Sequence, residues 1–261
     1  MIMGDLFEQR WNKKRAVWIP EHDLFDPKLY HVDVVPESIA KHFVVRHHYS
    51  GTYPAARFRA GLYKGDDLVG VAVFSIPASQ AVIPRYADIA PSEGVELGRF
   101  ILLDSCKFNA ETWFLKRAFK LLKANIGPRF CLSFSDPVPR HDYEGELVKP
   151  GHVGQIYQAT NAKYYGRASK STLWLMPNGR VMSPRALGKI RREESGKDYA
   201  IGQLIRAGAP EPLPNESGES YIERAKTCFT KIRHPGNLAY GWCFDKHVKT
   251  KLDELPYVKL N

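Results

Sequence analysis

Residues 46–58, RHHYSGTYPAARF, gather two adjacent histidines, two tyrosines, a serine and two arginines between apolar runs. Histidine moves protons near neutral pH, and tyrosine offers a flat aromatic face with a hydroxyl tip. We therefore take His48 and Tyr49 as candidate catalytic residues and Ser50 as a candidate substrate-binding residue. The alternative is that these side chains cap the edge of a core, with the apolar body buried and the polar tip in water.

A second group of candidates follows a predicted buried strand, RFCLSFSDP. Ligands gather at the carboxyl ends of strands in open α/β sheets, so Asp136 is a candidate catalytic base or orienting group. Ser135 and His152 are candidate substrate-binding residues, and Tyr157 is a candidate acid or oxyanion donor. Alternatively, Asp136 begins a turn before a proline, and Tyr157 packs on the sheet.

Arg99 stands in ELGRF, within another predicted strand. Successive strand residues alternate between faces, so we expect Arg99 and Glu96 to point in opposite directions. If both faces of the sheet are covered, a buried arginine needs an anionic partner. A bound phosphate or carboxylate would serve, which makes Arg99 a candidate substrate-binding residue; an internal salt bridge would serve as well.

A metal site is a different possibility. The donors available for a two-histidine, one-carboxylate iron site are His47, His48, Asp136, His141 and His152. Adjacent histidines generally diverge, and none of these donors stands in an HxD or HxxxH spacing. We therefore assign no metal ligand and keep iron as an alternative.

The charge of the chain favours an anionic partner. The 261 residues carry a formal net charge of +10, which suits DNA or RNA because binding releases condensed counterions. The four cysteines are scattered without a zinc-binding spacing, which favours a reduced cytoplasmic setting. No apolar run reaches the roughly 18 residues of a membrane span, so we expect no membrane partner.

The elements that must position these residues alternate along the chain. The pattern predicts a strand at YHVDVVP, a helix at ESIAKHFVVRHHY with Ile39, Phe43 and Val44 on one face, and a hairpin turning at KGDD. A strand at GVELGRFILLD then leads into a helix with Asn109 as its N-cap. The strand at RFCLSFSDP follows, then a short helix ending near Gly166 and a strand at STLWLMP. This order indicates a mixed sheet with helices on both faces.

The composition changes from about Val181, where basic helical sequence begins with a capped segment, SPRAL. We expect a catalytic domain over residues 1–180 and a basic helical extension over residues 181–261. The extension is interpreted either as a nucleic-acid contact surface or as a solvated helical flank.

Several spaced motifs, in order, resemble the phage Mom family of DNA-modifying proteins. They are HHYSGTYPA, ELGRFILLD, SFSDPVP, KPGHVGQIYQATNAKYYGR and SPRAL, spread over residues 42–187. The resemblance implies an α/β fold like that of the GNAT acyltransferases, in which two central parallel strands splay apart. It also implies conversion of adenine in double-stranded DNA to N6-(carbamoylmethyl)adenine, which protects phage DNA from restriction.

The resemblance leaves the donor open between acyl-CoA and an activated glycine such as glycyl-tRNA, which would make tRNA a second partner. GNAT enzymes hold acyl-CoA on a glycine-bearing loop, but here the loop is DSCKFNAETW, which has no glycine. Glu111 in the first helical turn would also repel a phosphate. We assign donor binding to Lys107, Asn109 and Lys116.

Two other functions stay open at this point. An N-acyltransferase acting on a small amine or a protein would bind CoA and need no DNA. A non-catalytic DNA-binding protein would keep its activity after Asp136→Ala or Tyr157→Phe.

Overall fold

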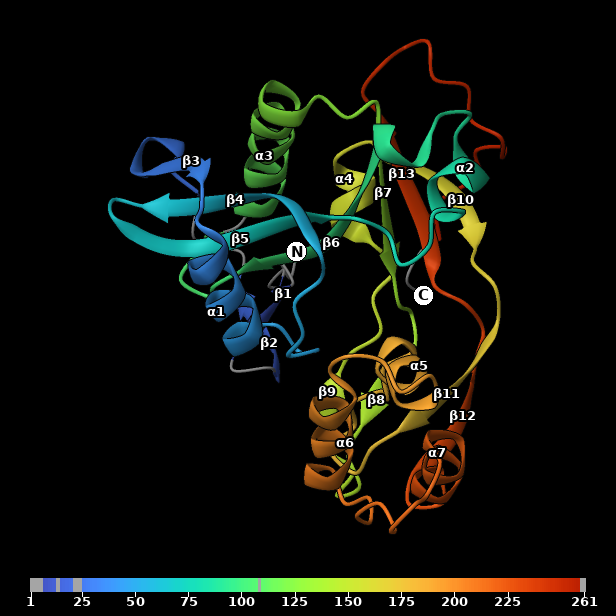
Figure 1. The fold of residues 1–261 in the computed structure, drawn as a ribbon. Coiled ribbons are helices and arrows are strands. Elements are labelled where there is room, and N and C mark those ends of the chain that lie inside the picture. Colours follow the sequence, from blue (N-terminus) through green and yellow to red (C-terminus); the bar gives the residue numbers. More distant parts are fainter. Residues whose placement is uncertain (1–6, 13–14, 21–24, 108, 259–261) are drawn as a thin grey trace. The chain divides into compact units, whose positions relative to one another are not determined.

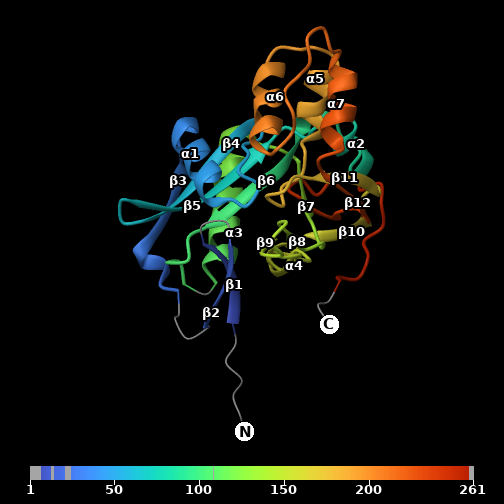
Figure 2. The same cartoon turned by 90° about the horizontal axis from the view of Figure 1, so that it is seen from below.

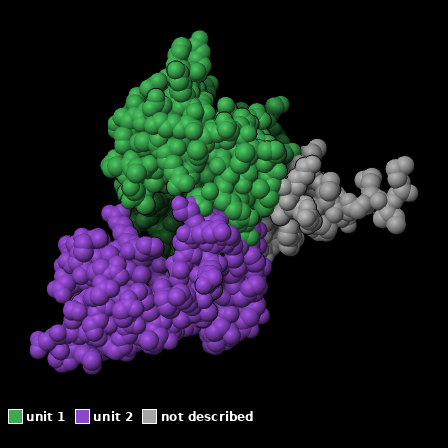
Figure 3. All heavy atoms as spheres, turned by 90° about the vertical axis from the view of Figure 1, so that its right-hand side faces the viewer, with its two compact units in different colours: residues 1–137, 152–168, 237–261 green, residues 138–151, 169–236 purple. Residues whose placement is uncertain are grey.

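A computed structural model describes residues 7–12, 15–20, 25–107 and 109–258. The chain forms two compact units, coloured separately in Figure 3. Unit 1 comprises residues 1–137, 152–168 and 237–261, and unit 2 comprises residues 138–151 and 169–236. Each unit is described by itself below.

Unit 1 is built on a seven-stranded sheet (Figure 1). In sheet order the strands are β10 (Lys163–Arg167), β13 (Leu238–Cys243), β7 (Phe130–Ser135), β6 (Gly94–Leu102), β5 (Asp67–Ser75), β4 (Ala56–Lys64) and β3 (Tyr30–Val34). Strands β6 and β7 run parallel, and the other neighbouring pairs of this sheet are antiparallel. The sheet is therefore mixed, as expected from the sequence.

Helices cover both faces of this sheet, as Figure 2 shows for α1 (Glu37–His47) and α3 (Ala110–Ile126). Phe43 and Val44 of α1 pack on one face with Val71, Val73 and Ile101 of the sheet. On the other face, α3 and α4 (Gln155–Ala159) contribute to the main core. Burying apolar side chains on both faces is the main favourable term for such a layered fold.

The parallel pair β6–β7 is joined over only part of its length. Its register is Gly94↔Phe130, Val95↔Cys131 and Glu96↔Leu132, after which no further partners occur although both strands continue. The two strands therefore separate after Glu96, which is the splay that the resemblance implies.

Smaller elements complete unit 1. They are the hairpin β1 (Phe7–Asn12) and β2 (Arg15–Pro20), the helix α2 (Val82–Tyr86), and the 3₁₀ turns η1 (Pro27–Leu29) and η2 (Pro91–Glu93). Among the described residues, no helix combines the length and apolar character that crossing a bilayer requires.

Unit 2 has a small core of its own. Its elements are β8 (Arg140–His141), β9 (Leu147–Lys149), β11 (Ser171–Leu175), α5 (Pro184–Arg191), α6 (Lys197–Arg206), α7 (Gly218–Lys226) and β12 (Thr230–His234). The core is centred on Ile190, Leu204 and Tyr221. Ser183 caps α5 by accepting a hydrogen bond from the Ala186 amide, which confirms the predicted capped helix.

The fold class and the hairpin predicted at KGDD are confirmed, and three expectations need correction. Ile39 is 49% exposed and does not share the buried face of α1, where Ala40 lies instead. The helix expected to end near Gly166 stops at Ala159, and the next residues form strand β10. The boundary expected at residue 180 differs from the observed units because β13, near the C-terminus, lies inside the central sheet of unit 1.

Candidate functional site

Strand β6 contains a β-bulge at Gly98. Val73 of β5 pairs with Arg99, whereas the next residue, Phe74, pairs with Leu97, so Gly98 is an extra residue in β6. A Cβ added to Gly98 would lie 2.5 Å from Ser75 Oγ. Bulges re-aim side chains, and glycine is used where another group approaches the backbone this closely.

The bulge corrects the prediction that Glu96 and Arg99 point in opposite directions. One extra residue shifts the alternation, so residues three apart across the bulge share a face. The charges of Glu96 and Arg99 accordingly act on each other's pKa values. Simple alternation failed here because the sequence carries no signal for the bulge other than a glycine inside a strand.

We expect Gly98→Ala to lower the free energy of unfolding by about 1–3 kcal/mol, because the new methyl collides with Ser75 Oγ. Ser75→Ala removes that oxygen, so the double variant should regain most of the loss. Urea unfolding of both single variants and the double variant measures this coupling. Additive losses would contradict the assigned contact.

Glu96 lies where β6 and β7 part, and it is largely buried. Burial raises the pKa of this carboxyl to about 6, and the positive charge of Arg99 offsets only part of the rise. At neutral pH the group is mainly ionised and can accept a proton from a bound substrate. A carboxyl poised near the working pH is suited to general base catalysis.

The raised pKa of Glu96 has a consequence for stability. The folded state binds the proton more tightly than the unfolded chain, so this group favours folding below about pH 4.5 and loses that contribution as the pH rises through about 6. The loss amounts to about 2 kcal/mol. We expect Glu96→Gln to remove this part of the pH dependence, measured by urea unfolding at pH 4 and pH 8. Equal pH dependence in variant and wild type would contradict the burial of this charge.

Tyr157 is held on α4 among the aromatic rings of Tyr240 and Trp242, with centroids 5.4 and 5.5 Å away. Its side chain hydrogen bonds with Ser133 of β7, and its electrostatic neighbours include Glu96 and Tyr49. Burial raises the pKa of Tyr157 to about 12, so the hydroxyl stays protonated at neutral pH and can act as a donor. Ser133 donates its single hydroxyl hydrogen to Leu97 O at 3.0 Å, joining β7 to β6 beyond the last ladder pair, so the Tyr157 hydroxyl is the donor in its hydrogen bond with Ser133.

Arg99 connects this group to the loop after α1. Its guanidinium donates to Thr52 O at 3.0 Å, to Thr52 Oγ1 at 2.8 Å and to Gly98 O. None of these acceptors is charged. Burial lowers the pKa of Arg99, while Tyr49, Glu96 and Tyr157 oppose that shift.

Four residues from distant parts of the chain thus act electrostatically on one another: Tyr49, Glu96, Arg99 and Tyr157. We call them the splay cluster. Three of them are predicted site residues.

Three more predicted residues lie at the end of β7, just after it and before α4: Ser135, Asp136 and His152. Asp136 is 7% exposed, and its carbonyl accepts the His152 amide at 3.0 Å. The His152 ring lies 6.4 Å from that of Tyr157, edge to face. Ser135 is fully buried, and among the described residues its hydroxyl has no hydrogen-bond partner.

His48 and Ser50 complete the arrangement on the loop after α1. His48 Nδ1 lies 2.8 Å from Ser50 Oγ, and the His48 ring lies 4.2 Å from that of Tyr49. Gly51 has a φ of +57°, which allows the tight turn between these residues and Thr52.

Comparison with protein-family models gives a match to the Mom protein family over residues 29–211. The chain belongs to the Mom protein family. The matched range includes the splay cluster and the loop after α1.

Solved structures similar to this Mom family chain include acetyltransferases. A Bacillus subtilis acetyltransferase in complex with CoA is 9% identical, with 82% of this chain and 99% of that chain covered and a TM-score of 0.32. A putative acetyltransferase from Pyrococcus horikoshii is 10% identical, with 86% and 92% covered and a TM-score of 0.36. A tandem GNAT protein from the clavulanic acid biosynthesis pathway is 9% identical, with 83% and 75% covered and a TM-score of 0.35. A search of curated proteins finds no match.

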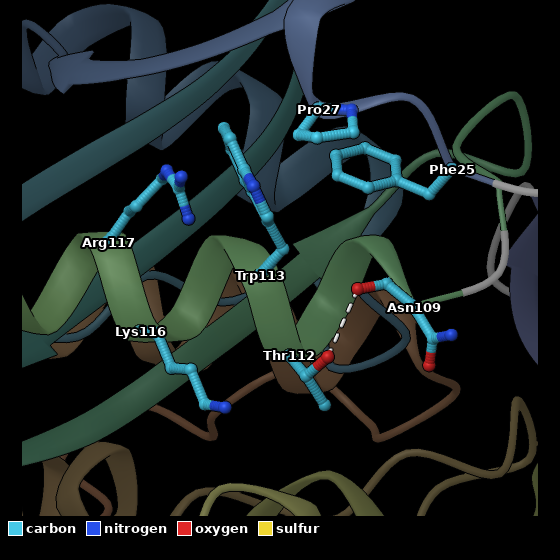
Figure 4. Close-up of a pocket in the computed structure, with 7 residues that line it drawn as sticks. All are labelled: Phe25, Pro27, Asn109, Thr112, Trp113, Lys116 and Arg117. Atoms are coloured by element: carbon cyan, nitrogen blue, oxygen red, sulfur yellow. Dashed lines mark hydrogen bonds between the residues drawn. The ribbon is translucent and has the colours of Figure 1, made fainter.

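The pocket that two of the residues assigned to donor binding line contains no member of the splay cluster. Asn109 and Lys116 line a pocket on α3, drawn in Figure 4, together with Phe25, Pro27, Thr112, Trp113 and Arg117. The Arg117 guanidinium stacks 3.6 Å from the centre of the Trp113 ring. Lys107 does not line this pocket. Asn109 precedes α3 as predicted, but its side chain makes no capping hydrogen bond.

The iron alternative finds no matching cluster within the described part of the chain. No three histidine, cysteine, aspartate or glutamate side chains there come close enough together to hold a metal ion.

Sequence reasoning missed Glu96, Ser133 and Thr52. Strand alternation places Glu96 on the opposite face from Arg99, and the bulge reverses that conclusion. Ser133 and Thr52 carry no distinctive spacing, since their roles come from contacts with residues far along the chain.

Proposed function

We propose that this chain is a transferase that modifies adenine in double-stranded DNA to N6-(carbamoylmethyl)adenine. The observation that carries the proposal is the meeting of Glu96, Arg99 and Tyr157 where β6 and β7 separate, in a chain of the Mom family. The net charge of +10 supports a polyanionic substrate. The target adenine must leave the base stack, at a cost of a few kcal/mol.

The exocyclic amine of adenine is a poor nucleophile because its lone pair is delocalised into the ring. It must be positioned while its proton is accepted and charge on the electrophile is stabilised. In our proposal Glu96 accepts the amine proton, and Tyr157 turns its hydroxyl hydrogen from Ser133 to the carbonyl oxygen under attack. Tyr49 stacks on the flipped base, and Asp136 orients the amine.

The transfer proceeds in two steps, an acyl transfer and a rearrangement. The amine attacks the carbonyl carbon of an activated glycine ester; a carbon–nitrogen bond forms, the ester bond breaks, and the alcohol leaves with a proton. The glycyl amine then attacks the ring carbon that carries the new amide. The bond from that carbon to the amide nitrogen breaks and the nitrogen takes up a proton, which leaves a carbamoylmethylamino group.

We propose that Lys107, Asn109 and Lys116 hold the anionic part of the donor. An aminoacyl ester of tRNA fits a loop without the glycines used for CoA, and acyl-CoA is the other candidate. A reconstituted reaction with purified chain and plasmid DNA separates them, because each donor can be omitted in turn. Undiminished product without aminoacylated tRNA would overturn the glycyl-tRNA assignment.

The proposed function as a whole is tested by expressing the chain with a plasmid, digesting the plasmid DNA to nucleosides and measuring their masses. We expect a deoxyadenosine derivative heavier by one glycyl residue. An unchanged deoxyadenosine pool in cells that contain folded protein would contradict the proposal. In that case a CoA-dependent acyl transfer to a small amine, assayed without DNA, becomes the leading function.

A further inference from the structure

A continuous chain of hydrogen bonds runs from Arg99 to His48 through the loop after α1. Arg99 Nη2 donates to Thr52 Oγ1 at 2.8 Å. Thr52 Oγ1 lies 3.2 Å from Ser50 Oγ, and Ser50 Oγ lies 2.8 Å from His48 Nδ1. The Ser50 amide also donates to His48 Nδ1, at 3.1 Å.

The two ends of this chain fix the direction of every hydrogen in it. A guanidinium can only donate, so Thr52 Oγ1 accepts from Arg99. A backbone amide can only donate as well, so His48 Nδ1 is an acceptor. Ser50 Oγ therefore accepts from Thr52 and donates to the same Nδ1.

We propose that Thr52 is a positioning residue that holds neutral His48 in the tautomer with its proton on Nε2. An imidazole whose Nδ1 accepts two hydrogen bonds must carry its single proton on the other nitrogen. Thr52 is the member that couples this preference to Arg99, because its hydroxyl joins the donor-only guanidinium to Ser50. Without that hydroxyl, Ser50 Oγ keeps only the longer hydrogen bond from the Thr52 amide, at 3.4 Å, so its own hydrogen is held less firmly on His48 Nδ1.

The role in the reaction rests on the proposed function. A neutral imidazole with its proton on Nε2 offers a hydrogen-bond donor beside Tyr49, whose ring lies 4.2 Å from it. Such a donor can bind the edge of the base or the carbonyl oxygen under attack. The wrong tautomer would present a lone pair there instead, and the contact would be lost.

The test compares Thr52→Val, which replaces the hydroxyl by a methyl of similar size, with Thr52→Ser, which keeps the hydroxyl. Nitrogen-15 NMR of histidine-labelled protein at fixed pH reports the tautomer of His48, with the His48→Gln variant used to assign its signals. We expect wild type and Thr52→Ser to show the Nε2-protonated form, and Thr52→Val to gain the Nδ1-protonated form. Modification should fall about tenfold in Thr52→Val at saturating DNA and stay within about twofold in Thr52→Ser.

The two readouts separate the failure of this inference from that of the proposed function. An unchanged His48 tautomer in folded Thr52→Val would overturn the positioning role, whatever the activity. Suppose that wild-type protein has the Nε2-protonated tautomer and Thr52→Val loses it, but that neither wild type nor any variant modifies DNA. The positioning role then stands and the proposed function fails. Equal loss of activity in Thr52→Ser and Thr52→Val would also contradict a role for the hydroxyl.

Discussion

Under the proposed mechanism, Tyr157→Phe is expected to slow DNA modification at least about 100-fold, because it removes the hydroxyl proposed to donate to the developing oxyanion. The phenyl ring should keep its packing against Tyr240 and Trp242. The fold should therefore survive, and the loss should appear in the rate at saturating substrate. Single-turnover kinetics with purified protein measures it.

Tyr240→Phe is the matched control, because it removes a hydroxyl from a neighbouring buried ring. The Tyr240 hydroxyl donates to Val153 O, and that carbonyl also accepts from Gln158 Nε2 at 3.0 Å, so it keeps a partner in the variant. We expect the Tyr240→Phe rate within about threefold of wild type. Equal rates in Tyr157→Phe and wild type would rule out a chemical role for the Tyr157 hydroxyl.

The second large effect concerns pH. If Glu96 accepts the amine proton, it must be ionised, so the wild-type rate should rise about tenfold per pH unit below about 6 and level off above it. Glu96→Gln should lose about 100-fold at pH 8 and show no such rise. The dependence of the single-turnover rate on pH from 5 to 8 is the measurement.

The pH profile also tests whether Glu96 or Asp136, the base predicted from the sequence, accepts the proton of the amine. A Glu96→Gln variant that keeps the wild-type profile would return that role to Asp136. Comparing Asp136→Asn with Glu96→Gln under the same conditions completes the test, because a residue that only orients the amine lowers the rate without removing the rise near pH 6.

The arrangement of the sheet could be predicted because apolar periodicity and turn residues mark its elements locally. The KGDD turn between β4 and β5 and the strand before Asp136 are examples. The position of β13 could not be predicted, because it depends on pairing between residues far apart: Leu238 pairs with Ser135. Pairing across such separations leaves no local pattern.

The candidate site could be predicted only in part, because some of its members are identified by contacts between residues far apart in the chain. Tyr49 and Tyr157 stand out as polar aromatic residues at element ends. Recognising Glu96 as a site residue requires knowing that Gly98 forms a β-bulge. One extra residue reverses every inside–outside assignment beyond it. The partners of Arg99 likewise come from a loop 47 residues earlier in the chain, and Thr52 carries no chemical signature of its own.

The central claim is that the target adenine sits against the splay cluster, and photo-crosslinking tests it most directly. DNA in which 8-azidoadenine replaces part of the adenine is irradiated with the protein, and the cross-linked peptides are identified by mass spectrometry. The account predicts adducts within residues 48–52, 96–99, 135–137 or 152–157. Adducts confined to the helices α5, α6 and α7 of unit 2 would contradict it.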